Sequence, residues 1–335
     1  MYNSVKFARL ALLSRIENAN STTQTNPRTQ PMHLIGNTPL VKLRSLPGRD
    51  YADVYVKFEG ANPTGSMKDR MALSMIKGAE RRGELGPGGR VVEYTGGSTG
   101  SSLAMVCATR GYQAHFVSSD GFAQEKLQTM RAFGATVEII PAPGGILTAN
   151  VIDRMIARTR ELVGEPGTFW PDQVNNPDNK RGYHGMAREI LAELDAGIDE
   201  FVVAVGGGGC ISGNAEILKE HVPGIRVVAV EPFYVRNISG GDTSGKHRLE
   251  GIGLSFVPGI LRRDLIDEVV PVKDEDAYST ARDLARREGI FGGATSGANL
   301  WAALQRARAL GPGKTVVTVI IDSGLRYLNG DLYRS

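Results

Sequence analysis

From Leu34 onward the sequence alternates between apolar, β-branched stretches and segments of helical periodicity. The stretches with strand character cover 39–43, 54–58, 91–94, 115–118, 136–140, 201–205, 226–230 and 315–321. The segments with helical character cover 70–82, 101–110, 123–133, 149–163, 181–194, 212–221, 275–288 and 297–310. Parallel strands need a crossover that is usually a helix, so this alternation predicts an α/β fold whose mostly parallel sheets carry helices on both faces.

The length of 335 residues fits two such units, each with three layers, joined at a seam near 141–145. We expect residues 56–145 to form a smaller α/β domain, and residues 31–55 together with 146–335 to form a larger one. Residues 1–30 differ in composition, because a basic amphipathic segment is followed by a polar linker. This N-terminal tail fits either a transit peptide or a segment that packs on a partner subunit, and we favour the second.

The charge balance is nearly even, with 39 Lys and Arg against 36 Asp and Glu. No basic run or basic-aromatic pattern is present in the sequence, so nucleic-acid binding is not expected. No apolar run reaches the roughly 18 residues of a membrane span. The two cysteines, Cys107 and Cys210, do not make a disulfide framework, and with five scattered histidines no metal site is expected. The cytoplasm is the expected location.

Glycine-rich segments follow several of the predicted strands, where α/β proteins bind ligands. Residues 206–210 read Gly-Gly-Gly-Gly-Cys between a strand and a helix, so their N–H groups can converge on a phosphate. Residues 95–100 fit either a carboxylate site or a simple helix cap, and residues 292–298 are typical of a cap. Asp322 and Ser323 follow the last strand and point to opposite faces, so only one of them can reach a given ligand.

One lysine is placed in an unusual position. The turn 62–65 follows the strand 54–58, and Ser66 can cap the next helix, which puts Lys68 in the first helical turn. The positive end of the helix dipole disfavours an ammonium there and favours the neutral amine, which attacks carbonyls. Alone, a solvated surface lysine is the simpler interpretation. Together with a phosphate loop and a polar group at a strand end, the set suits pyridoxal 5'-phosphate.

The motifs carrying these residues resemble the cysteine synthase family, the β-family of pyridoxal-phosphate enzymes that includes O-acetylserine sulfhydrylase and cystathionine β-synthase. The likeness extends over about residues 34–333, in one order, through 35–41, 62–70, 95–100, 173–177, 206–210, 230–232, 247–253, 295–297 and 322–328. It implies pyridoxal-phosphate fold type II, with two domains as in the tryptophan synthase β subunit. The smaller domain would carry the substrate carboxylate loop, and the larger one would bind the cofactor. A homodimer is also implied.

The resemblance also implies the roles of individual residues. Lys68 would bind the cofactor's aldehyde covalently and move the substrate's α proton. The cofactor's phosphate would be held by Gly206, Gly207, Gly208, Gly209 and Cys210. The substrate carboxylate would be held by Thr95, Gly96, Ser98, Thr99 and Gln173. Ser98 would also face the phenolic oxygen of the cofactor, and Ser323 its pyridine nitrogen. The far side of the cleft would be lined by residues 251–253, including Gly251, and by Thr295 and Ser296.

This sequence departs from the family's usual loops at four positions. Gly96 and Ser98 stand where serine and asparagine are usual, so an amide that can contact cofactor and substrate is missing. Gly207 and Cys210 stand where threonines are common, which leaves more of the phosphate binding to backbone N–H groups. The donor substrate could therefore differ from O-acetylserine. Arg236, Lys126 or Arg131 could meet a phosphorylated donor, although solvated side chains are the favoured interpretation.

The function predicted on this basis is β-replacement on serine or an O-activated serine, O-acetylserine or O-phosphoserine, with sulfide or a thiol, as in a cysteine synthase. A serine opposite the pyridine nitrogen favours β-elimination and replacement over transamination. Three alternatives stay open: condensation of serine with homocysteine as in cystathionine β-synthase, a serine or threonine dehydratase, and a pyridoxal-phosphate-binding partner subunit without activity. Turnover separates the last of these from the enzymes, because a cofactor-binding subunit would also be yellow.

Overall fold

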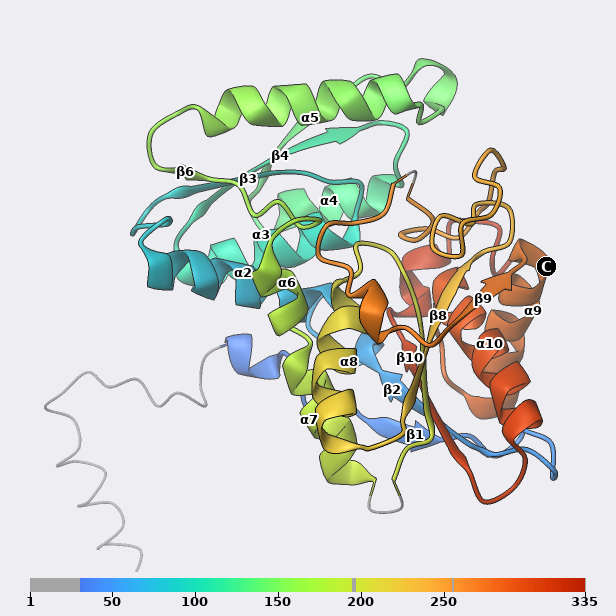
Figure 1. The fold of residues 1–335 in the computed structure, drawn as a ribbon. Coiled ribbons are helices and arrows are strands. Elements are labelled where there is room, and N and C mark those ends of the chain that lie inside the picture. The colour runs from blue at the N-terminus through green and yellow to red at the C-terminus, as the bar shows by residue number, and fades with distance from the viewer. Residues whose placement is uncertain (1–30, 195–196, 255, 335) are drawn as a thin grey trace, which may run out of the picture. The chain divides into compact units, whose positions relative to one another are not determined.

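The computed structural model describes residues 31–194, 197–254 and 256–334, and within them it contains two β-sheets (Figure 1). The larger sheet has six strands in the order β1-β2-β10-β7-β8-β9. Neighbouring strands are parallel except for β1 and β2, which are antiparallel. The strands are β1 Leu40–Lys42, β2 Asp53–Phe58, β7 Glu200–Ala204, β8 Arg226–Pro232, β9 Glu268–Val272 and β10 Thr315–Ile320.

The smaller sheet has four parallel strands in the order β5-β4-β3-β6. They are β3 Arg90–Tyr94, β4 Gln113–Ser119, β5 Thr136–Ile140 and β6 Thr168–Phe169. In Figure 1 the helix α5, Ala149–Val163, covers one face of this sheet, and α2, α3 and α4 lie on the other side. The last three helices are Lys68–Arg82, Ser98–Arg110 and Gln124–Ala132.

The six-stranded sheet is also covered on both faces. The helix α10, Ala294–Leu310, packs on β10, β2 and β7, with α9, Asp274–Asp283, beside it. The opposite face carries α8, Gly209–His221, and α7, His184–Glu193, with the short α6, Pro177–Arg181, next to them (Figure 1). One hydrophobic cluster contains Val91 and Phe116 of the smaller sheet together with Phe201 and Val203 of the larger one, so the two sheets share a continuous core.

The predicted α/β class with mostly parallel sheets is confirmed by this topology. Two strands, β6 and β9, were not predicted, because β6 has two residues and Pro271 interrupts the apolar pattern of β9. The helix at Lys68 begins where it was expected, but its N-cap position belongs to Met67 and not to Ser66. Ser66 still contributes, because its hydroxyl accepts a hydrogen bond from the backbone N–H of Lys68 at 3.3 Å.

The two sheets divide the chain at other places than the predicted domain limits of 56 and 145. Residues 56–58 belong to β2 and thus to the six-stranded sheet. The helix α5 and the strand β6, which lie beyond residue 145, pack on and pair with the four-stranded sheet. The reason is that α5 is the crossover from β5 to β6 within one sheet. Because β6 was not predicted, α5 was not assigned to that sheet.

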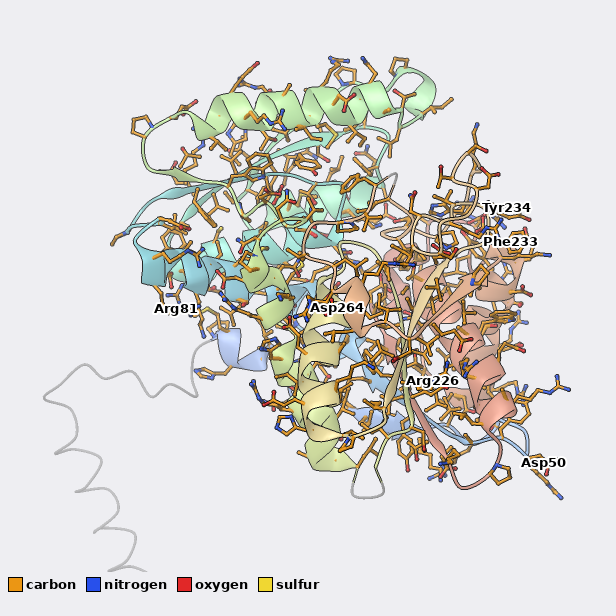
Figure 2. The ribbon with its side chains drawn as sticks, viewed as in Figure 1. Asp50, Arg81, Arg226, Phe233, Tyr234 and Asp264 are labelled. Atoms are coloured by element: carbon orange, nitrogen blue, oxygen red, sulfur yellow. The ribbon has the colours of Figure 1, made fainter. Side chains whose placement is uncertain are left out.

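Charged side chains such as Asp50, Arg81, Arg226 and Asp264 lie on the exposed surface (Figure 2). The aromatic rings of Phe233 and Tyr234, after β8, form an edge-to-face pair at 5.2 Å there. No helix within the described residues has the length and apolar character to cross a membrane. The N-terminal tail predicted for residues 1–30 lies outside the described residues.

Candidate active site

Lys68 is the first residue of α2 and is half-buried. Burial lowers the pKa of its amine below the ordinary value, against the opposing influence of Cys210 and Asp322. Within the described part of the chain, its ammonium group has no hydrogen-bond or ion-pair partner. A lysine that is drawn out of water without a counterion is biased towards the neutral amine, the form that attacks a carbonyl. The placement of Lys68 in the first helical turn is confirmed.

The glycine loop lies between β7 and α8, as predicted. Residues 206–211 offer six consecutive backbone N–H groups, and none of these groups has an acceptor among the described residues. Most of the loop is buried, and Gly208 adopts a left-handed conformation with φ of 79°. Unpaired buried N–H groups are costly, and a row of them at a helix N-terminus is typical of an anion site. The loop therefore fits the phosphate of pyridoxal 5'-phosphate.

Cys210 is buried in the first turn of α8, next to this loop. Burial raises the pKa of its thiol to about 12, so the sulfur is protonated at neutral pH. Asn214 donates to the carbonyl of Cys210 at 2.8 Å and approaches its Sγ at 3.6 Å. The side chain of Cys210 thus serves packing, and its backbone N–H is what it offers to an anion.

The loop at 95–100 has some backbone N–H groups that are bonded and others that are free. The hydroxyl of Thr95 accepts from the N–H groups of Gly97 at 3.3 Å and Gly100 at 3.1 Å, and so closes the turn ahead of α3. The N–H groups of Gly96, Ser98 and Thr99 have no acceptor within the described residues. Those three groups remain available to a carboxylate, while the Thr95 hydroxyl satisfies two other N–H groups of the turn; the N-cap position itself belongs to Gly97.

Gln173 is placed beside this loop by two contacts. Thr99 Oγ1 donates to Gln173 Oε1 at 2.7 Å, so the structure places the loop and Gln173 side by side. The backbone N–H of Gln173 donates to Glu93 Oε2 at 3.3 Å, and Trp170 Nε1 donates to Glu93 Oε1 at 3.0 Å. Sequence reasoning missed Glu93, because a lone glutamate within a strand carries no signal of the segment it will contact.

Burial raises the pKa of Glu93 from 4.5 to about 8. A carboxyl whose pKa is higher in the folded than in the unfolded state holds more protons when folded, so its contribution to stability falls as the pH rises from 4.5 to about 8. We expect the melting temperature of the wild type to fall over this range relative to that of E93Q, whose side chain does not titrate. Thermal unfolding at several pH values measures this difference. The exposed Glu165 supplies the control E165Q, and equal pH profiles for all three proteins would contradict the role of Glu93.

Gly96 and Gly97 are packed against side chains of the next helix region. A Cβ at Gly96 would lie 2.1 Å from Cε1 of Phe122, and a Cβ at Gly97 would lie 2.6 Å from Cδ of Lys126. Lys126 itself is buried and forms an ion pair with Glu250, so it is not a solvated side chain. Its ammonium also lies 5.5 Å from the ring centroid of Tyr327. The ring of Phe122 thus fills the space that a serine at position 96 would need.

Accordingly, Gly96→Ser is expected to destabilise the protein by about 1–3 kcal/mol, the usual cost of overpacking. Removing the ring of Phe122 should recover part of this loss of stability. The double variant G96S/F122A should therefore be more stable than the sum of the two single changes predicts. Chemical denaturation of the four proteins of this cycle gives the coupling free energy. Additive effects would show that Phe122 does not restrict position 96.

The polar groups at the end of β10 are held by local hydrogen bonds. Ser323 Oγ accepts from the N–H of Leu325 at 3.3 Å and caps the short 3-10 helix η7, Gly324–Tyr327. Asp322 is buried and accepts from Tyr327 Oη at 2.5 Å. The hydroxyl of Ser296, in the first turn of α10, is fully buried, accepts from the N–H of Ile321 at 3.0 Å and lies 3.5 Å from Asp322 Oδ1. Two hydroxyls, of Ser296 and Ser323, therefore lie near this strand end.

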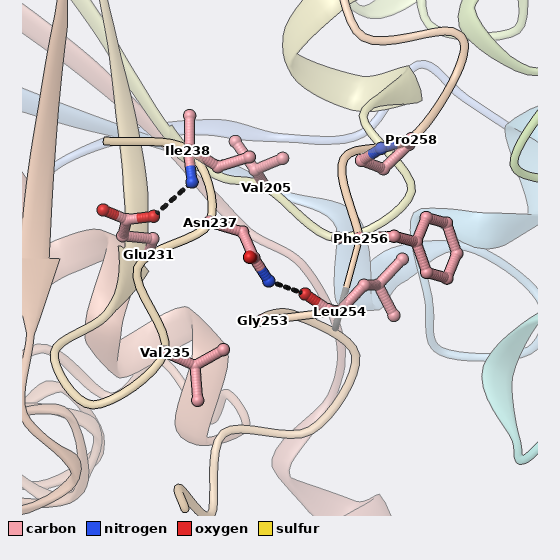
Figure 3. A pocket seen from close by; sticks show the side chains of 10 residues that line it. Val205, Glu231, Val235, Asn237, Ile238, Gly253, Leu254, Phe256 and Pro258 are labelled. Carbon is pink, nitrogen blue, oxygen red and sulfur yellow. Dashed lines mark hydrogen bonds between the residues drawn. The ribbon is translucent and has the colours of Figure 1, made fainter. Parts of the chain in front are cut away.

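The segment 247–254 adjoins the glycine loop. A Cβ at Gly206 would lie 2.1 Å from the carbonyl oxygen of Gly251, and Thr295 Oγ1 donates to the carbonyl of Glu250 at 2.9 Å. A small pocket lies beside Val205 and Gly206, and Figure 3 shows how its walls are held: Glu231 accepts from the N–H of Ile238, and Asn237 donates to the carbonyl of Leu254. The structure thus brings the predicted residues Gly206, Gly251 and Thr295 to one region.

Comparison with known proteins identifies the family. The family model described as "Pyridoxal-phosphate dependent enzyme" matches residues 32–322, and the chain belongs to this family. A cysteine synthase from Staphylococcus aureus (strain Mu50 / ATCC 700699) is 42% identical over 302 residues, which are 90% of this chain and 95% of that protein. The resemblance to cysteine synthases is therefore confirmed, and the chain is a pyridoxal-phosphate-dependent enzyme.

Solved structures agree with this assignment. An O-ureido-L-serine synthase superposes with a TM-score of 0.85 at 36% identity, covering 91% of this chain and 95% of its own. A cysteine synthase from Entamoeba histolytica superposes with a TM-score of 0.86 at 33% identity, covering 93% of each chain. These two similar structures carry different names, so the fold defines the cofactor chemistry and leaves the second substrate to the details of the site.

Proposed function

We propose that this enzyme replaces the β-substituent of an O-activated serine with sulfide, as a cysteine synthase does. The observation that carries the proposal is that Lys68 interacts electrostatically with Cys210, within the segment 206–211 whose backbone N–H groups have no acceptor among the described residues. Bound pyridoxal 5'-phosphate would supply an electron sink for the loss of a proton from Cα. The 42% identity to a cysteine synthase supports sulfide as the nucleophile.

The chain's own residues would divide the work among three loops. Lys68 would bind the aldehyde carbon of the cofactor and then accept and return the Cα proton through its Nζ. The N–H groups of residues 206–210 would hold the phosphate, which fixes the position of the ring. The N–H groups of Gly96, Ser98 and Thr99, with Gln173, would orient the substrate carboxylate, so that the Cα proton faces Lys68. Ser98 would also face the phenolic oxygen.

Two serine hydroxyls, those of Ser323 and Ser296, are candidates for the hydrogen bond to the pyridine nitrogen. Each of the two hydroxyls accepts one backbone N–H, Ser323 from Leu325 at 3.3 Å and Ser296 from Ile321 at 3.0 Å. Ser296 also donates to Asp322 Oδ1 at 3.5 Å, whereas the proton of the Ser323 hydroxyl has no acceptor among the described residues. We expect removal of the hydroxyl that faces the nitrogen to shift the visible absorption band of the bound cofactor and to lower turnover about tenfold. Spectra and kinetics of S296A and S323A decide between them. If neither variant changes the spectrum, no serine at this position contacts the ring.

A panel of substrates tests the proposed reaction. The full chain loaded with pyridoxal 5'-phosphate is mixed with O-acetylserine, O-phosphoserine or serine, each with sulfide, with homocysteine, or with no nucleophile. We expect cysteine as the main product from one of the activated donors. Cystathionine from serine and homocysteine, or pyruvate formed at the same rate without a nucleophile, would replace the proposal with the condensing enzyme or the dehydratase. The absence of every product would indicate a binding subunit.

The proposal includes a homodimer in the cytoplasm, as expected from the resemblance and from the cysteine content. Analytical ultracentrifugation of the full chain tests the first expectation. A mass equal to that of one chain of 36.0 kDa at micromolar concentration would contradict it.

A further inference from the structure

Arg326 connects two loops of the candidate site. It lies in η7, shortly after β10. Its Nη1 donates to the carbonyl oxygen of Thr64 at 2.6 Å, and its Nη2 donates to Ser98 Oγ at 3.2 Å. Thr64 belongs to the turn that precedes Lys68, and Ser98 begins the helix after the carboxylate loop. The guanidinium group therefore lies where the lysine turn meets the carboxylate loop.

The positive charge of this arginine is not neutralised by any near neighbour. Among the described residues no salt bridge within 4.0 Å involves this guanidinium, and both of its acceptors are neutral. Its Nε is buried and has no hydrogen-bond partner within the described chain. By contrast, the half-buried Arg306 pairs with Glu200 and Glu268. Because charges withdrawn from water are normally paired, this guanidinium lacks an anion.

Two carboxyl groups, those of Asp69 and Asp322, interact electrostatically with Arg326, but neither forms an ion pair with it among the described residues. Asp69 feels the charge of Arg326, but its oxygens accept from the N–H and hydroxyl of Thr64 at 2.8 and 2.6 Å. Asp322 accepts from Tyr327. Burial raises the pKa of both carboxyls, which weakens their ionisation further. The guanidinium is therefore left without a direct ion-pair partner and is open to an anionic ligand.

We propose that Arg326 binds an oxyanion of the amino-acid donor, either its α-carboxylate or an anionic β-substituent such as phosphate. The planar guanidinium, with a free Nε–H and hydrogens left on both Nη atoms, suits the paired oxygens of a carboxylate or phosphate. Its hydrogen bond to Ser98 places it beside the three N–H groups expected to hold the substrate. The inference rests on the proposed function and specifies the class of donor.

Calorimetric titration of the cofactor-loaded enzyme with three unreactive probes tests this site. L-Alanine carries only the α-carboxylate, L-2-aminobutanoate adds one carbon, and L-2-amino-4-phosphonobutanoate adds an anion beyond Cβ. The variants are R326Q and R326K, with R282Q as the control. Arg282 is also half-buried and also donates to two carbonyl oxygens, of Leu332 at 2.6 Å and Asp331 at 3.2 Å, but it is held by the C-terminal segment.

We expect R326Q to weaken binding about tenfold to a hundredfold, and R326K to have a smaller effect, while R282Q binds as the wild type does. A loss for all three probes assigns the α-carboxylate to Arg326, whereas a loss confined to the phosphonate assigns the β-substituent. Unchanged affinities for every probe in R326Q would overturn the inference.

A second measurement avoids dependence on the folding of R326Q. If that variant does not fold, R326K must still bind at least one probe more weakly than R282Q does, because a lysine cannot bridge Thr64 and Ser98 in the same way. Equal affinities in R326K and R282Q would overturn the inference. If the wild type binds no probe at all, the proposed function fails, which is a separate result.

Discussion

Replacement of Lys68 by alanine is expected to lower β-replacement turnover by at least about a thousandfold, while the protein stays folded. The expected size reflects the loss of a group that is proposed both to bond to the cofactor and to move the α proton, since general acid–base catalysis alone contributes about 10²–10⁴. The lowered pKa of the Lys68 amine and its lack of a partner in the described chain both suit this role. Steady-state formation of cysteine from O-acetylserine and sulfide measures the effect.

The same helix supplies a matched control for this substitution. Lys77 lies nine positions later in α2 and is exposed, so K77A removes an equivalent side chain outside the site. We expect K77A to retain the turnover of the wild type. Thermal unfolding of K68A shows whether the fold is intact. Turnover of K68A within tenfold of the wild type would contradict the assignment of Lys68.

Replacement of Gly206 by alanine is expected to prevent binding of the cofactor and to lower stability by about 1–3 kcal/mol. The new Cβ would lie 2.1 Å from the carbonyl oxygen of Gly251, and a backbone atom cannot move aside as a side chain can. Either the glycine loop or the segment that contains Gly251 must shift, which would turn the N–H groups of 206–211 away from a common centre. Absorbance titration with pyridoxal 5'-phosphate and thermal unfolding report the two effects.

Gly207 provides the control for this change. A Cβ at Gly207 would find its nearest neighbour, the carbonyl oxygen of Gln173, at 3.9 Å, which is an ordinary contact. G207A should therefore bind the cofactor with an affinity within about threefold of the wild type and keep its melting temperature. Equal losses in G206A and G207A would mean that the loop responds to added volume in general, and that close packing on Gly251 is not the reason.

The fold could be predicted from the sequence to a large extent, because each helix and most strands carry their own periodicity. The strand β7, Glu200–Ala204, and the glycine loop after it are contiguous in the chain, so their order alone placed the loop at the carboxyl end of a parallel strand. The strand β6 has only two residues and no periodicity, and its pairing with β3 depends on residues about 80 positions apart. The expected limits of the smaller domain therefore took no account of this strand.

The sequence predicted those parts of the candidate site that depend only on the backbone of neighbouring residues. The first-turn position of Lys68 and the free N–H groups of the glycine loop follow from the order of strand, turn and helix. The side-chain partners were not predictable in this way. Glu93 contacts Gln173 across 80 positions, and Arg326 contacts Ser98 across 228 positions. Such contacts depend on how the two sheets are assembled, and no local pattern encodes them.

Peptide mapping of the reduced holoenzyme tests the central claim most directly. Treatment with borohydride fixes pyridoxal 5'-phosphate to the lysine that binds it, and mass spectrometry of the proteolytic fragments then identifies that lysine. We predict that the added mass lies on Lys68. The added mass on Lys126, Lys57 or any other lysine, with Lys68 unmodified, would contradict the account of this site.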